Sequence, residues 1–130
     1  MINFYASEKN IRPELLDSEA LKYANTMLHV KPTQMRRIFD QVKHLEKRLQ
    51  GGESWEKIEP LVKMQKAHIA YTVRRGKKNG GMDSETSWIN LEKFINDGIE
   101  SVNSKEDYST FCLLMEAVYA FYYARTPERV

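Results

Sequence analysis

Apolar residues recur at helical spacing along most of this 130-residue chain, and this narrows the possible folds more than any other feature. Ile38, Val42, Leu45 and Leu49 follow one another at steps of four, three and four residues, which places them on one side of an α-helix. Alternating apolar and polar residues, the usual signal for strands, are nearly absent. The pattern predicts an all-α fold, a single-domain bundle of about five helices.

Capping residues, prolines and glycines predict where these helices begin and end. We expect residues 1–10 to form a flexible arm. The first expected helix begins at Asp17 or Ser18 and ends before Pro32, the second runs from Thr33 as N-cap to Gln50, and the third runs from Ser54 to about Arg75. The fourth begins near Asp83 or Ser84, and its expected core positions are Trp88, Leu91, Ile95, Ile99 and Val102. The fifth runs from Ser104 to about Arg125 and is ended by Pro127. Gly76–Gly81 should form a basic loop, and Gly98 should weaken the fourth helix locally.

Two of the expected helices are apolar over more than one side. In the third helix a broad arc that includes Ile58, Met64, Ile69 and Tyr71 predicts a central position in the bundle. The fifth helix is apolar nearly all round from Phe111 to Ala124, so that one bundle face cannot bury all of it. Either this helix is central or part of it contacts another protein chain, and we favour some intermolecular contact.

The charge of the chain is strongly segregated, although the net charge is only +2. Residues 31–80 hold 13 basic and 5 acidic residues, whereas residues 81–130 hold 4 basic and 9 acidic residues. Such a basic middle indicates a polyanionic partner, and the acidic remainder indicates a different one.

The basic residues of the third helix are the strongest functional signal. Every charged residue from Pro60 to Lys78 is basic, and at about 100° per residue four of them share one narrow edge opposite the apolar arc. Solvated helix faces usually mix charges of both signs, so a set without acidic residues favours contacts with phosphates. The candidate RNA-binding residues on the second and third helices are Arg36, Arg37, Lys43, Lys47, Lys63, Lys66, Arg74, Arg75, Lys77 and Lys78.

The residues that usually carry catalysis show no matching pattern. His29, His44 and His68 form no metal-binding pair, and His68 falls on the apolar arc, where we expect a buried core histidine. Cys112 lies in an apolar run, where a thiol is usually inert. We therefore expect no enzyme activity, no catalytic residue, no metal and no cofactor.

Compartment is indicated by the N-terminus and by the cysteine content. The opening segment MINFYASEKN lacks the basic and apolar regions of a signal peptide, and a single cysteine fits a reducing environment. The apolar run from Phe111 to Ala124 is too short to span a bilayer. We expect a cytoplasmic protein without a membrane partner.

Three stretches together carry a family resemblance. They are KPTQMRRIFDQVKHLEKRL (residues 31–49), LVKMQKAHIAYTVRRGK (residues 61–77) and YSTFCLLMEAVYAFYYAR (residues 108–125). In this order and spacing they resemble the small helical subunit of type III-A CRISPR effector (Csm) complexes. The similarity extends from residue 11 to residue 125.

This resemblance implies a non-catalytic helical subunit of an antiviral ribonucleoprotein. Its copies would stack along guide RNA and target RNA beside other subunits, which carry the cleavage activities. The basic motif positions that would face RNA are Arg36, Arg37, Lys63, Lys66, Arg74 and Lys77, and Tyr71 would be a packing residue. Two alternatives remain: a protein–protein adaptor whose basic edge docks an acidic partner, and the analogous small subunit of a type III-B complex.

Overall fold

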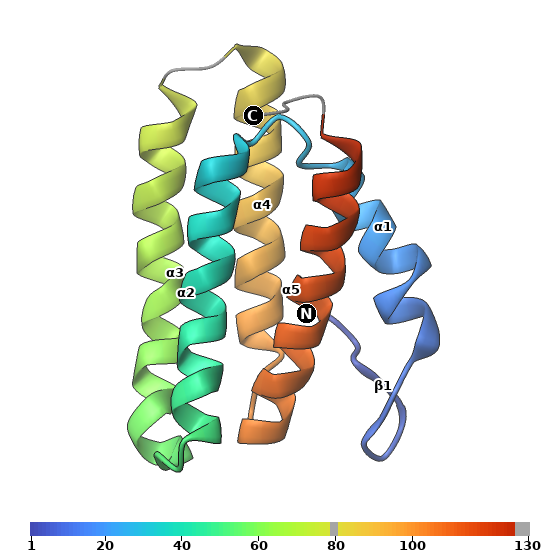
Figure 1. Ribbon diagram of the computed structural model, residues 1–130, viewed down its shortest axis with the longest axis vertical. Coiled ribbons are helices and arrows are strands. Elements are labelled where there is room, and N and C mark those ends of the chain that lie inside the picture. The colour runs from blue at the N-terminus through green and yellow to red at the C-terminus, as the bar shows by residue number, and fades with distance from the viewer. Residues whose placement is uncertain (79–80, 127–130) are drawn as a thin grey trace.

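The computed structural model describes residues 1–78 and 81–126, and these residues form five α-helices (Figure 1). The helices are α1 (Ser18–Asn25), α2 (Pro32–Gln50), α3 (Trp55–Lys77), α4 (Met82–Glu100) and α5 (Lys105–Arg125). A 3-10 helix, η1 (Pro13–Leu16), precedes α1, and two short strands, β1 (Tyr5–Ser7) and β2 (Asn10–Ile11), form an antiparallel hairpin. The prediction of an all-α fold is confirmed, with this hairpin as a small addition.

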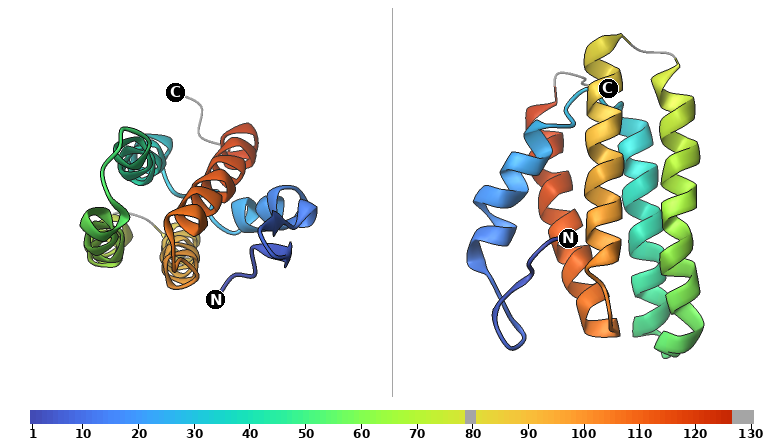
Figure 2. Two further views of the ribbon diagram at one scale, coloured as in Figure 1. Left: turned by 90° about the horizontal axis from the view of Figure 1, so that it is seen from below. Right: turned by 180° about the vertical axis from the view of Figure 1, so that it is seen from behind.

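The fifth helix lies at the centre of the molecule. α5 packs against α1, α2, α4 and η1, whereas α3 packs mainly against α2 and α4. Viewed along the helices, α3 and α1 lie at opposite sides of the molecule, with α5 between them (Figure 2). The central position explains why α5 is apolar nearly all round, and its buried side chains include Tyr108, Phe111, Met115 and Tyr122.

The prediction that α3 is central is wrong, because its apolar arc is not buried as a whole. The buried residues of α3 are Ile58, Val62, Gln65, Ile69, Val73 and Gly76, and this single stripe is enough to pack a helix at the edge of a bundle. Met64 is 46% exposed and Tyr71 is 65% exposed. These two residues belong to the outer surface that α3 shares with α2.

Most helix ends lie where capping chemistry predicts them. Ser54 caps α3 by accepting a hydrogen bond from the Lys57 N–H, and α5 begins after Ser104. α2 begins one residue early, at Pro32, because proline fits the first helical position and needs no N–H partner there. The remaining ends differ more: α1 ends at Asn25, well before Pro32, α3 reaches Lys77, and α4 begins at Met82. The expected roles of Pro127 and of residues 79–80 lie outside the described residues.

Residues 1–10, which we expected to form a flexible arm, are packed against the bundle. Ile2 and Phe4 are buried in the core, and the Ile2 N–H donates to Ser101 Oγ at 2.6 Å. The two strands have three and two residues, which is too short for a recognisable alternation of apolar and polar residues, so no sequence pattern predicts them. The hairpin therefore adds both a strand pair and core residues to the bundle.

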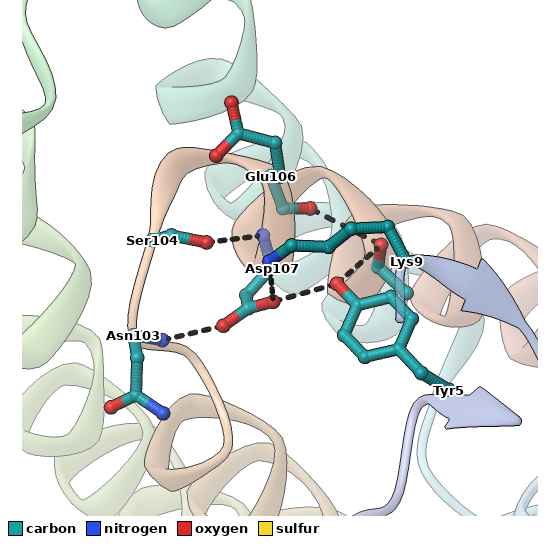
Figure 3. A network of polar contacts seen from close by, with 7 residues as sticks. Tyr5, Lys9, Asn103, Ser104, Glu106 and Asp107 are labelled. Atoms are coloured by element: carbon teal, nitrogen blue, oxygen red, sulfur yellow. Dashed lines mark hydrogen bonds and ion pairs between the residues drawn. The ribbon is translucent and has the colours of Figure 1, made fainter. Parts of the chain in front are cut away.

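A polar network fixes this hairpin to the start of α5 (Figure 3). The Tyr5 hydroxyl donates to Asp107 Oδ1 at 2.6 Å, and Lys9 Nζ lies 3.7 Å from the same oxygen. Asp107 Oδ2 accepts from the Asn103 N–H at 3.0 Å, while Ser104 Oγ accepts from the Asp107 N–H at 3.1 Å. Ser104 and Asp107 thus form a variant of the capping box at the start of α5, and the Asp107 carboxylate also anchors β1.

Two glycines allow neighbouring helices to approach closely. A Cβ at Gly76 of α3 would overlap the Trp88 ring of α4, and a Cβ at Gly98 of α4 would overlap the Phe111 ring of α5. The core positions expected for the fourth helix, Trp88 among them, are all buried, although Val102 lies beyond the end of α4. Gly98 therefore makes room for a core aromatic ring, a role that helix propensity alone does not predict.

Candidate nucleic-acid interface

Consecutive helices α2 and α3 form a long grooved surface at the edge of the bundle. The N-terminal half of α2 lies beside the C-terminal half of α3, because a short connection makes the two helices antiparallel. One cavity between them, which we call the arginine groove, has a volume of about 210 Å³. It is lined by Gln34, Arg37, Ile38, Gln41, Tyr71, Thr72 and Arg75.

A larger cavity adjoins the arginine groove and shares Arg37 and Gln41 with it. This cavity, which we call the apolar groove, has a volume of about 650 Å³. Its remaining lining residues are Thr33, Arg36, Asp40, His44, Leu45, Leu61, Met64, Gln65 and His68. His68 is exposed in this groove, so the expectation of a buried core histidine is wrong.

Tyr71 and Arg75 form a pair one helical turn apart on the exposed side of α3. Arg75 Nη1 donates to the Tyr71 hydroxyl at 3.3 Å, and the guanidinium carbon lies 5.7 Å from the centre of the ring. This cation–π contact holds the guanidinium beside the ring without neutralising its charge. Tyr71 is 65% exposed, so it is not the packing residue that the resemblance implied.

The two neighbouring arginines of α2 have different surroundings. Arg36 donates from Nε to Asp40 Oδ1 at 3.2 Å, and its hydrogen bonds with Tyr119 and Asp40 raise its pKa. Arg37 is exposed and, among the described residues, has no ion pair. None of the described residues that line the arginine groove is acidic. Arg37 and Arg75 are therefore the cations of this surface that are free to meet an anion.

The basic edge of α3 is less free than its own sequence indicates. α4 runs alongside and contributes acidic residues: Lys66 Nζ lies 3.2 Å from Glu100 Oε2. Near the other end, Arg74, Lys77 and Lys78 line a cavity of about 440 Å³ together with Glu85 and Glu92. From Pro60 onwards α3 has no acidic residue of its own, and α4 supplies acidic residues beside it, which a count within one helix cannot reveal. Lys63 is exposed and has no ion pair within the described residues.

The lysines of α2 are also divided between paired and free positions. Lys43 Nζ lies 2.7 Å from Glu46 Oε1 and 3.7 Å from Glu116 Oε2, and the hydrogen bond that the lysine donates to Glu46 raises its pKa. Lys47 is exposed. The structure therefore brings Arg37 together with Arg75 at the arginine groove and with Arg36 at the apolar groove. It places Lys66, Arg74, Lys77 and Lys78 beside acidic residues of α4, and it directs Lys43 towards acidic residues of α2 and α5.

Several polar residues of the grooves carry no charge, and charge counting did not find them. Gln34, Gln41 and Thr72 line the arginine groove, and Gln65 lines the apolar groove. Gln34 and Gln41 lie within the first family stretch, and Gln65 and Thr72 lie within the second. Their position within these two stretches is the one sequence feature that could have indicated them.

Other kinds of site find little support in the described part of the chain. No group of three or more histidine, cysteine, aspartate or glutamate residues there is arranged to hold a metal ion. Burial raises the pKa of the Cys112 thiol, which keeps it protonated. No helix among the described residues is both long and apolar enough to cross a membrane.

Comparison with known proteins identifies the family of the chain. Residues 10–128 match the family model described as Csm2 Type III-A, which covers nearly the whole length. No curated protein and no solved structure matches the chain. The family is that of the structural small subunit of the type III-A CRISPR complex, whose partners are the other subunits of that complex. On the strength of this match and of the helical bundle that accompanies it, the chain belongs to the Csm2 type III-A family.

Proposed function

We propose that this subunit is a non-catalytic RNA-binding protein of its complex and that the arginine groove contacts the backbone of guide or target RNA. The observation that carries the proposal is the convergence of Arg37 from α2 with Tyr71 and Arg75 from α3. These residues come from two of the three stretches on which the family resemblance rests. Two unpaired guanidinium groups on one rigid surface suit successive phosphates, which accept bidentate hydrogen bonds.

The basic edge of α3 supplies a second and weaker set of contacts in this proposal. RNA that binds Lys66, Arg74 or Lys77 must compete with Glu100, Glu92 and Glu85 of α4. Lys63 and Lys47 have no ion pair with an acidic residue in the described structure, so they are candidates for RNA contacts as the groove arginines are. Phosphate contacts of this kind give affinity with little sequence information.

We also propose that the exposed side of α5 contacts other subunits, including further copies of this chain along the RNA. Leu113 is 43% exposed and Tyr123 is 58% exposed there, although α5 is otherwise a core helix. Exposed large apolar residues on a central helix mark a surface that a neighbouring protein can cover.

RNA binding is tested with the full-length protein and a single-stranded oligonucleotide, titrated over a range of salt concentrations. Arg37→Ala and Arg75→Ala should each weaken binding about tenfold, as expected for the loss of a charge-assisted hydrogen bond. Each should also lower the slope of log affinity against log salt by about 0.7, because one fewer counterion is released from single-stranded RNA. Lys22→Ala is the matched control, since Lys22 is exposed on α1 at the far side of the bundle.

Unchanged affinity and salt slope in both arginine variants, with native circular dichroism, would refute the arginine groove as an RNA contact. An adaptor without RNA contacts is the second candidate, because the same basic surface can dock an acidic protein. The 260/280 absorbance ratio of the chain produced and purified without the other subunits separates the two, since an adaptor brings no RNA with it. Cleavage of RNA by the isolated chain would contradict the non-catalytic assignment.

A further inference from the structure

The apolar groove has features that phosphate binding does not require. Its volume of about 650 Å³ is in the range of small-ligand sites, and Leu45, Leu61 and Met64 contribute apolar walls. Met64 is 46% exposed, although it is a large apolar side chain. A phosphate needs cations and hydrogen-bond donors, whereas walls of this kind suit the flat and weakly polar face of an aromatic ring.

Gln65 supplies an unused hydrogen-bond acceptor at this groove. The residue is only 7% exposed, and its Nε2 donates to the Tyr108 hydroxyl at 3.2 Å. That hydroxyl gives its own hydrogen to the Val42 carbonyl at 2.7 Å, which fixes the orientation of the amide. Gln65 Oε1 is buried and has no hydrogen-bond partner in the described structure. A buried acceptor without a donor is unfavourable, so a ligand N–H at this position would relieve a cost that the free protein carries.

Arg37 connects the two grooves. It lines both cavities, so one basic residue is shared by the apolar walls and by the phosphate-binding residues proposed above. A ligand that combines a planar heterocycle bearing N–H groups with an adjoining phosphate matches this arrangement, and a nucleotide is such a ligand. In a double helix the base edges are paired and the faces are stacked, so only an unpaired nucleotide can present both.

We infer that the apolar groove receives one unpaired base of the bound RNA. The base lies against Leu61 and Met64, its N–H donates to Gln65 Oε1, and Arg37 binds the adjoining phosphate. Met64 is unbranched and flexible, so the groove can adjust to admit the base edge to the buried acceptor. This inference rests on the proposed RNA-binding function and adds to it a site for the base, beside the sites for the backbone.

The test compares two ligands of equal length on the full-length protein: oligouridylate, and an oligomer of the same sugar–phosphate backbone without bases. Uracil stacks weakly on itself and offers one ring N–H, so free-ligand structure does not obscure the result. The wild-type protein should bind oligouridylate about tenfold more tightly than the abasic oligomer. Gln65→Met and Met64→Ala should reduce this ratio to about twofold while leaving the affinity for the abasic oligomer unchanged. Met64 is exposed, so its variant keeps the test valid even if Gln65→Met fails to fold.

Tyr71→Leu is the control, because Tyr71 lines the arginine groove alone and should leave the ratio unchanged. Equal binding of both oligomers to the wild-type protein would overturn the base site and leave phosphate binding intact. Binding of neither oligomer would instead refute the proposed function, so the two failures are distinguishable. A ratio that falls in Tyr71→Leu but not in Gln65→Met or Met64→Ala would place the base on the tyrosine and also overturn the inference.

Discussion

Replacing Gly98 by alanine should destabilise the protein, although alanine is the better helix former. At an unconstrained position in a helix the substitution would stabilise by about 0.5–1 kcal/mol. Here the added Cβ overlaps the fully buried Phe111 ring, whose centre lies 5.9 Å from that of the Phe94 ring and 6.3 Å from that of the Tyr108 ring. The ring cannot retreat without moving both neighbours, and such overpacking costs about 1–3 kcal/mol or more.

The net expectation is a loss of about 1–2 kcal/mol in the free energy of unfolding, measured by urea denaturation followed by circular dichroism. For a chain of this size the loss corresponds to a fall of roughly 3–8 °C in melting temperature. Gly51→Ala is the matched control. Gly51 has an ordinary φ of −79°, and the nearest atom to an added Cβ is 3.4 Å away, so the control should be neutral or slightly stabilising. A Gly98→Ala protein as stable as the wild type would refute the close-packing explanation.

Two further predictions concern carboxylates held by hydrogen bonds. Tyr5→Phe should cost about 1.5–3 kcal/mol at pH 7, the usual range for a hydrogen bond to a charged group. Burial acts to raise the pKa of Asp107, but hydrogen bonds from Tyr5 and the Asn103 N–H outweigh it and hold the pKa below 3.8. In urea unfolding at several pH values, the difference in the free energy of unfolding between wild type and variant should therefore shrink as the pH falls below about 4. A difference that stays constant with pH would contradict this. The bidentate hydrogen bonds from Arg48 lower the pKa of Glu53 to about 2, so Arg48→Gln should return that pKa towards 4.5 in an NMR titration, and an unchanged value would exclude the arginine as the cause.

The positions of the helices were readable from the sequence because their determinants are local. The apolar stripe that includes Ile38 and Leu49 and the caps at Ser54 and Ser104 each depend on residues within a few turns. Which helix lies at the centre of the bundle and which lies at its edge could not be predicted in the same way, since this depends on how well the apolar faces of different helices pack together. Tyr71 and Met64 have the apolar character of core residues, yet α3 needs only one stripe to pack at the edge of the bundle.

The candidate site was only partly readable for a related reason. Charge counting found Arg37 and Arg75 but gave them no priority over Lys66 and Arg74, because a count along one helix ignores the helix beside it. The uncharged groove residue Gln65 was invisible to such a count, and its unpartnered oxygen depends on a bond to Tyr108, 43 residues away. Long-range polar contacts of this kind can be seen only after the helices are assembled.

The acidic residues of α4 determine which basic residues are available to a polyanion. Glu100 pairs with Lys66, and Glu85 and Glu92 share a cavity with Arg74, so the α3–α4 side is largely compensated. On the α2–α3 side, none of the described residues that line the arginine groove is acidic, and Asp40, which lines the adjoining apolar groove, is bound to Arg36. A phosphate approaching α3 therefore meets less competition and less repulsion on the groove side. α3 therefore has basic residues on the side that faces α2 and on the side that faces α4. The neighbouring helices, and not the sequence of α3, determine that those on the α2 side are more available to a phosphate.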